Sequence, residues 1–172
     1  MIVVSDTTPL ISFLKVGHID LLEKLFGKVF VPQAVYNELT ADIRFKHEAQ
    51  QIEQSTFIEV RAVENIGSVS VLKRATGLDQ GESEAIVLTD ELKADVLLMD
   101  EAKGRTVSNE MGIKVMGTIG ILMAAYEECE LTSSEAKECI DILQRTGRHI
   151  SQKHYQMLLD MLSEQPVRQR KQ

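Results

Sequence analysis

The segment Ile2-Val3-Val4-Ser5-Asp6-Thr7-Thr8-Pro9 contains the pattern that decides the fold. Ile2–Val4 is an unbroken run of β-branched residues, which is typical of a strand buried on both faces of a parallel sheet. Asp6 follows this strand, and Thr8 with Pro9 then predicts a helix, with Thr8 as the N-cap and Pro9 at the first helical position. A strand that leads directly into a helix is the building unit of an α/β domain.

The rest of the chain repeats this alternation of apolar runs and amphipathic segments. We expect strands at residues 2–4, 29–31, 57–60, 96–99 and 113–115. We expect helices at about residues 9–16, 19–26, 32–39, 41–54, 66–75, 79–93, 102–111, 118–129, 133–145 and 151–162. Strands interleaved with helices imply a parallel sheet with right-handed crossovers. The sequence therefore predicts a three-layer α/β/α fold, with one domain over residues 1–165 and a basic tail at 166–172.

Composition narrows the class of protein. A chain of 172 residues with 44% hydrophobic residues is long enough for one domain with its own core. The net charge of −7 argues against a general duplex-DNA binder, although a nuclease whose acids gather at a metal is compatible with it. No apolar run approaches the roughly 20 residues that span a membrane. Cys129 and Cys139 lack metal-ligand spacing, so we expect reduced thiols in a cytoplasmic protein.

Two of the expected strands end on carboxylates. Asp6 follows the first strand, and Asp100-Glu101 follows the strand at 96–99. The carboxyl ends of parallel strands border the crevice in which ligands bind, so these acids can converge from distant parts of the chain. Converging carboxylates repel unless a cation lies between them, which makes Mg²⁺ or Mn²⁺ the first candidate. The simpler alternative is that each acid favours the N-terminus of the helix that follows it.

Three glutamates on the expected helices add to this set. Glu38 has no helical ion pair to explain it, because Asp42 lies four residues on and would repel it. Glu82 fits a capping box that begins at Asp79. Glu84 has no such explanation and points to a different face of the helix. Either Glu82 or Glu84 could reach the end of the sheet, and the sequence leaves this choice open.

Taken together, these motifs resemble those of the PIN-domain nucleases over nearly the whole chain. The resemblance rests on Val3-Val4-Ser5-Asp6-Thr7, Val31-Pro32-x-x-Val35-x-x-Glu38-Leu39, Asp79-Gln80-Gly81-Glu82-Ser83-Glu84-Ala85-Ile86, Leu97-Leu98-Met99-Asp100-Glu101-x-x-Gly104-Arg105 and Gly112-Ile113-x-Val115-x-Gly117-Thr118-x-Gly120. It implies a parallel sheet that brings three or four acids together around Mg²⁺ or Mn²⁺, and cleavage of single-stranded RNA.

The resemblance also assigns roles to individual acids. Asp6 matches the family's first-strand aspartate, Glu38 its helix glutamate and Asp100 the acid after the fourth strand. The third acid falls on Glu82 or Glu84. The subgroup that the last two motifs resemble commonly has a second aspartate after the fourth strand, and this chain has Glu101 there. The longer side chain leaves the role of Glu101 open.

The chemistry that fits this set is metal-assisted hydrolysis of a phosphodiester, with one or two ions. Thr7 or Thr8 could orient a phosphate oxygen, and Lys103 and Arg105 could contact the phosphodiester. Many small PIN proteins resemble the VapC-type toxins of toxin–antitoxin pairs, which implies a homodimer and a small antitoxin-like protein as partners. The alternative function is a PIN scaffold with weak or no catalysis that acts as a nucleic-acid-binding or regulatory module.

Overall fold

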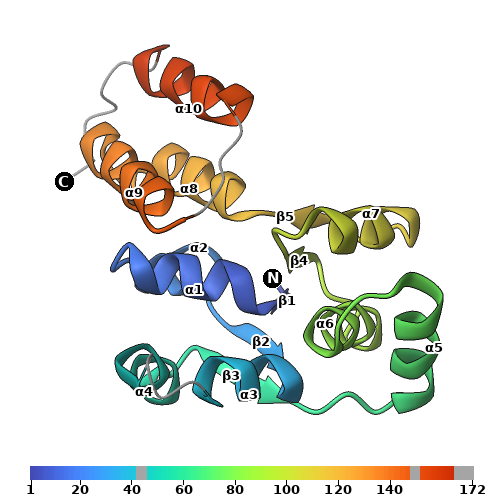
Figure 1. Ribbon diagram of the computed structural model, residues 1–172. Helices are drawn as coiled ribbons and strands as arrows, with labels where there is room; N and C mark the ends of the chain where they lie inside the picture. The colour runs from blue at the N-terminus through green and yellow to red at the C-terminus, as the bar shows by residue number, and fades with distance from the viewer. Residues whose placement is uncertain (42–45, 148–151, 165–172) are drawn as a thin grey trace.

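The structure is a computed structural model that describes residues 1–41, 46–147 and 152–164. The strands of this part of the chain form one parallel sheet in the order β3-β2-β1-β4-β5 (Figure 1). They are β1 (Val3–Ser5), β2 (Val29–Pro32), β3 (Ile58–Arg61), β4 (Val96–Leu98) and β5 (Val115–Met116). Parallel neighbours need long crossover connections, and helices supply these here.

Within the described residues, a helix lies in each segment for which the sequence predicts one. They are α1 (Thr7–Lys15), α2 (Asp20–Phe26), α3 (Gln33–Ala41), α4 (Lys46–Gln54), α5 (Ile66–Thr76), α6 (Gln80–Glu91), α7 (Ala102–Glu110), α8 (Thr118–Glu127), α9 (Ser133–Arg145) and α10 (Gln152–Glu164). The predicted α/β fold with a central parallel sheet is confirmed.

Alternate side chains of the strands pack into two separate hydrophobic cores, one on each face of the sheet. Val3 and Leu98 face the larger core, which is built with α1–α4 and α8–α10. Val4 and Leu97 face the other core, which is built with α5, α6 and part of α7. All four side chains are fully buried. Because strand side chains alternate between faces, a strand covered on both sides is mainly apolar, as Val3–Val4 and Val96–Leu98 are.

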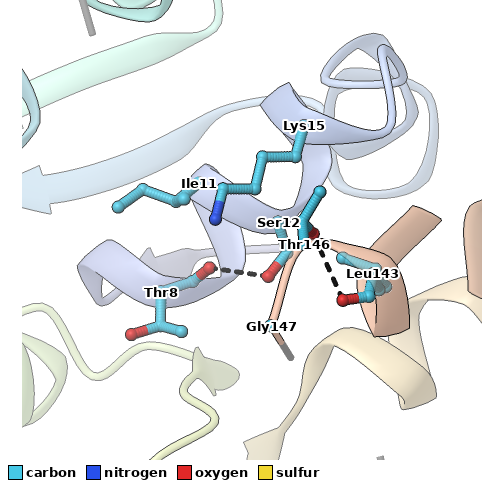
Figure 2. A pocket seen from close by; sticks show the side chains of 7 residues that line it. All are labelled: Thr8, Ile11, Ser12, Lys15, Leu143, Thr146 and Gly147. Carbon is cyan, nitrogen blue, oxygen red and sulfur yellow. Dashed lines mark hydrogen bonds between the residues drawn. The ribbon is translucent and has the colours of Figure 1, made fainter. Parts of the chain in front are cut away.

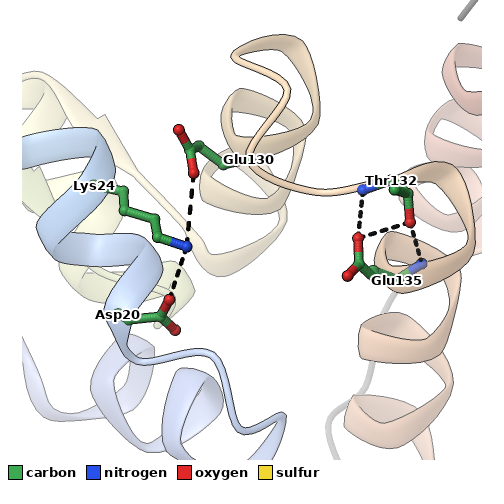
Figure 3. A network of polar contacts seen from close by, with 5 residues as sticks. All are labelled: Asp20, Lys24, Glu130, Thr132 and Glu135. Atoms are coloured by element: carbon green, nitrogen blue, oxygen red, sulfur yellow. Dashed lines mark hydrogen bonds and ion pairs between the residues drawn. The ribbon is translucent and has the colours of Figure 1, made fainter. Parts of the chain in front are cut away.

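Polar side chains cap the N-terminus of α9 and link α2 to the connection between α8 and α9. Thr132 and Glu135 form a capping box at the N-terminus of α9, with their reciprocal hydrogen bonds drawn in Figure 3. In the same view, Lys24 of α2 bridges Asp20 of its own helix, at 2.9 Å, and Glu130 of the α8–α9 connection, at 3.7 Å. These ion pairs are exposed, so packing rather than charge holds α2 in place.

The prediction that Thr8 is the N-cap of the first helix is wrong. The helix begins one residue earlier, at Thr7, and Asp6 is its N-cap residue, with extended backbone and no side-chain cap hydrogen bond. Pro9 is therefore the third helical residue, where its missing N–H still leaves no hydrogen bond unmade. The helix starts directly at the strand end because Asp6 itself makes the turn between the two.

Two predictions depend on residues that lie outside the described part of the chain. They are the basic tail at 166–172 and the repulsion of Glu38 by Asp42. The domain boundary at residue 165 stays a prediction for the same reason. Among the described residues, no helix is both long enough and apolar enough to span a bilayer.

Candidate active site

The candidate site lies at the carboxyl ends of β1 and β4, which are neighbours in the middle of the sheet. The strand order reverses between them, because β2 and β3 lie to one side of β1 while β4 and β5 lie to the other. Open parallel sheets bind ligands outside the strand ends at such a point. Asp6 follows β1 directly and donates its backbone N–H to the carbonyl oxygen of Leu98 at 2.9 Å. Asp100 follows β4 after Met99, so both strand-end acids lie at this edge.

Asp6 is the only acid in the described part of the chain that is buried, with 3% of its surface exposed. The pKa of its carboxyl group is raised to about 7, mainly by burial, and a hydrogen bond from the backbone N–H of Thr7 opposes this rise. The negative charges of Asp79, Glu82 and Glu38 also contribute to the rise, in that order. A carboxylate that other carboxylates surround in this way has a strong electrostatic reason to attract a cation.

Glu38 lies on α3, the helix that follows β2, and β2 is on the other side of β1 from β4. Its Oε2 accepts a short hydrogen bond from the hydroxyl of Thr7, the first residue of α1. Its carboxylate lies against Gly81 of α6, where a Cβ would come within 2.7 Å of Oε1. Burial raises the pKa of Glu38, the hydrogen bond from Thr7 lowers it, and the charges of Asp79 and Glu84 raise it. The small residue at position 81 therefore makes room for the carboxylate.

The capping box predicted at the start of α6 is present. Asp79 Oδ1 accepts the N–H of Glu82 at 2.8 Å, and Glu82 Oε2 accepts the N–H of Asp79 at 2.9 Å. Glu84 makes different contacts: Oε2 accepts the N–H of Ala34 near the N-terminus of α3 at 3.0 Å, and Oε1 accepts from Gln80 at 2.6 Å. Oε2 of Glu84 therefore links α6 to α3, whereas Oε1 is engaged within α6.

The two glutamates also act on different neighbours. The charge of Glu82 raises the pKa of Asp6, whereas that of Glu84 raises the pKa of Glu38. The pKa of Glu82 is itself raised by burial and then by the charges of Asp79 and Glu101, with the Asp79 N–H and Lys103 opposing these effects. In this structure Glu82 is thus the glutamate of α6 that faces Asp6.

Thr118 donates two hydrogen bonds to the carboxylate of Asp100. Its Oδ1 accepts the backbone N–H of Thr118 at 2.8 Å, and its Oδ2 accepts the Thr118 hydroxyl at 2.6 Å. Glu101 is exposed at the N-cap of α7 and makes no side-chain cap hydrogen bond. The charge of Glu101 acts on Glu82. The structure therefore brings Asp6, Glu38 and Glu82 into one electrostatic group, with Asp100 fixed against α8.

The two candidate substrate-binding residues of α7, Lys103 and Arg105, make different contacts. Lys103 is exposed near the start of α7, and its ammonium lies 3.0 Å from where a Cβ on Gly77 would be. Arg105 donates from Nη1 to the carbonyl oxygen of Met99 at 3.0 Å, so part of its guanidinium group stabilises the strand end. Lys103 is the cation whose charge acts on the acids, through Glu82.

Thr7 and Thr8 lie on different sides of α1. The hydroxyl of Thr7 reaches Glu38. Thr8 instead borders a hollow of about 200 Å³ between α1 and α9, together with Ser12 and Thr146 (Figure 2). In this hollow the Ser12 hydroxyl donates to the carbonyl oxygen of Thr8 at 2.9 Å. Of the two threonines, Thr7 is the one in contact with the acids.

Sequence reasoning missed two residues of this site. Asp79 was considered only as a helix cap, yet its charge raises the pKa values of Asp6, Glu38 and Glu82. Thr118 stood within a motif of the family but had no role. The sequence offered no signal that separates a capping aspartate from one that also faces other acids, because the neighbours come from other elements.

The acids fit a divalent metal in chemistry, although their side chains do not form a finished ligand cage. Mg²⁺ and Mn²⁺ prefer carboxylate oxygens, and the buried, charge-crowded Asp6 is suited to such an ion. Within residues 1–41, 46–147 and 152–164, no three Asp, Glu, His or Cys side chains are placed to hold a metal ion. Glu38 and Glu82 would have to turn toward Asp6 to complete a site.

A family model described as PIN domain matches residues 2–164 of the chain. The chain therefore belongs to the PIN-domain family, as the sequence motifs indicate. PIN domains are in general nucleases that act on nucleic acids with the help of divalent metal ions. No curated protein and no solved structure matches the chain.

Proposed function

We propose that this protein is a metal-dependent endoribonuclease that hydrolyses phosphodiester bonds of single-stranded RNA with Mg²⁺ or Mn²⁺. The observation that carries the proposal is the buried Asp6 at the reversal point of a PIN-domain sheet, with its pKa raised to about 7 partly by three other acids. Such crowding of negative charge is costly for a protein unless a cation offsets it.

In this proposal Asp6 is the central ligand, and Glu38 and Asp100 are its partners. Glu82 completes the first set of acids, because its charge acts on Asp6. When bound, the metal would polarise the phosphoryl oxygen and lower the pKa of the attacking water. Thr7 holds Glu38 through its hydroxyl, and so keeps that carboxylate beside Asp6.

Three further residues surround this set. Glu84 keeps α3, and with it Glu38, at its distance from α6 through the N–H of Ala34. Lys103 lies beside Glu82 with an exposed ammonium, which suits a contact with a substrate phosphate. Glu101 is exposed at the N-cap of α7 and its charge acts on Glu82, so it would add negative charge beside the metal ligands rather than serve as one of them.

The test is cleavage of a 5′-fluorescent single-stranded RNA with Mn²⁺, with Mg²⁺ and with chelator. We expect cleavage only with metal, and loss of at least about 100-fold in rate for Asp6→Asn, since removal of a metal ligand removes the metal's contribution to catalysis. Asp20→Asn is the matched control, because Asp20 is an exposed aspartate on α2 that forms an ion pair with Lys24 of the same helix. Full activity of Asp6→Asn with Mn²⁺ would defeat the proposal.

A parallel pair of variants tests whether Glu82 or Glu84 is the metal ligand. Glu82→Gln should weaken the Mn²⁺ dependence of cleavage. Glu84→Gln should leave it close to wild type, because its oxygens already bind Ala34 and Gln80. The reverse outcome would move the metal ligand from Glu82 to Glu84 and leave the nuclease proposal intact.

The second candidate is a PIN scaffold with weak or no catalysis that binds nucleic acid or a regulatory partner. It is favoured by the lack of a finished metal cage among the described residues and by the hydrogen bonds that occupy Asp100 and Glu84. Thermal unfolding in increasing Mn²⁺ separates the two candidates, since only an ion that binds the folded state raises the Tm. No shift at millimolar Mn²⁺ would favour the scaffold.

We also propose that the protein acts in the cytoplasm as the toxin of a toxin–antitoxin pair, as a homodimer that a small protein blocks. The resemblance to VapC-type toxins supports this role. The first check is whether a small reading frame adjoins the gene, followed by co-expression and co-purification of the two products. Absence of any such neighbour would remove the toxin role without affecting the nuclease.

A further inference from the structure

Thr118 donates two hydrogen bonds to the carboxylate of Asp100. Its backbone N–H meets Oδ1 at 2.8 Å and its hydroxyl meets Oδ2 at 2.6 Å. Thr118 is 3% exposed, so water competes little for these bonds. Thr118 therefore contacts both oxygens of Asp100, which restricts the rotation of the carboxylate plane.

The backbone around this contact is shaped to allow it. A Cβ on Gly117 would lie 2.9 Å from Asp100 Oδ1 and 2.9 Å from Arg105 Nη1, distances that side chains essentially never adopt. The backbone of Gly117 is ordinary extended chain, with φ −96° and ψ 172°. Space, and not backbone conformation, is thus what glycine provides at position 117. It lets the N-terminus of α8 come close to Asp100.

A structural role alone would explain part of this arrangement. Gly117, the N-cap of α8, has no side chain to satisfy the first N–H groups, and Asp100 supplies an acceptor from the end of β4. A negative charge is also favourable at a helix N-terminus. The hydroxyl bond to Oδ2 goes beyond this need, because the N–H of Thr118 is already satisfied by Oδ1.

Metal-binding carboxylates are usually held by further hydrogen bonds that orient them toward the ion. A carboxylate oxygen has two lone pairs, so a hydrogen bond from Thr118 does not by itself prevent a carboxylate oxygen from binding a cation. We propose that Thr118 is the positioning residue of the metal site, which sets the orientation of Asp100 through its hydroxyl. This inference rests on the proposed function.

The test measures Mn²⁺ affinity directly by isothermal titration calorimetry, apart from cleavage. Thr118→Val removes the hydroxyl, keeps the backbone N–H and has nearly the same shape. We expect it to bind Mn²⁺ about 10- to 100-fold more weakly, the usual loss when such an outer hydrogen bond is removed. Thr118→Ser restores the hydroxyl and should bind within about 3-fold of wild type, a smaller change than the loss expected for Thr118→Val.

A double variant excludes a purely structural effect. If Thr118 acts through Asp100, adding Thr118→Val to Asp100→Asn should weaken Mn²⁺ binding no further, because the two substitutions remove one interaction. An equal loss in both backgrounds would overturn the inference and leave Thr118 as a packing residue. Circular dichroism confirms that each variant is folded, and Thr118→Ala replaces the valine variant if that one does not fold.

Failure of this inference and failure of the proposed function give different results. Wild-type protein that binds Mn²⁺, with Thr118→Val binding equally well, refutes the role of Thr118 alone. Wild-type protein that binds no Mn²⁺ refutes the metal site and the role of Thr118 together.

Discussion

Asp6→Asn is expected to stabilise the metal-free protein at neutral and alkaline pH. The pKa of Asp6 is raised in the folded state to about 7 from an ordinary value of 3.8, mainly by burial. The folded state therefore holds a proton more tightly than the unfolded state does. Its stability benefits from this group at low pH and loses the benefit as the pH rises through 7. Asparagine carries no charge at any pH, so the variant lacks this loss.

The size of the effect follows from the pKa difference. Between 3.8 and about 7 the folding free energy changes by about 1.4 kcal/mol per pH unit. From pH 5.5 to pH 7 the variant should gain about 2 kcal/mol relative to wild type, and above pH 7 the gain should level off. For a domain of this size that is a difference of about 4–8 °C in Tm.

The assay is thermal or urea unfolding of wild type and variant at several pH values from 5.5 to 8.5, with chelator present. Asp90→Asn is the control, since Asp90 is an exposed aspartate on α6 whose partner is Lys93 at 2.9 Å. That variant should show no growing advantage with pH. A constant difference between Asp6→Asn and wild type across the range would refute the reasoning, because burial would then not raise the pKa of Asp6.

Three further substitutions probe the packing around the acids. Gly104→Ala should cost about 1–3 kcal/mol in urea unfolding, because its Cβ would overlap the Sδ of the fully buried Met99; an unchanged midpoint would contradict this. Gly81→Ala should change the Tm by little but weaken the rise in Tm with Mn²⁺, since its Cβ would push on Glu38 Oε1 at 2.7 Å, and an unchanged Mn²⁺ response would speak against that contact. Glu84→Ala should cost about 1 kcal/mol by circular dichroism melting, because α3 loses an acceptor near its N-terminus; stability equal to wild type would show that water replaces the carboxylate.

Much of the fold could be predicted from local patterns. The β-branched run at Ile2–Val4 and the capping box between Asp79 and Glu82 carry their structural reason within a few residues. The one clear error was local too: Thr8 was expected to cap the helix, and Asp6 does so. Thr8 and Asp6 are both good N-cap residues, so composition alone could not choose between them.

The sequence by itself determined that acids stand at the ends of two strands, since strand and acid are adjacent in the chain. Only the tertiary structure decided which acids act on one another. Glu82 and Glu84 are separated by about 200° around one helix, so their roles depend on what lies on each side of it. Those neighbours, Asp6 for one and the N-terminus of α3 for the other, come from distant parts of the chain. Burial and charge interactions depend on distance in space, and the sheet edge creates that proximity.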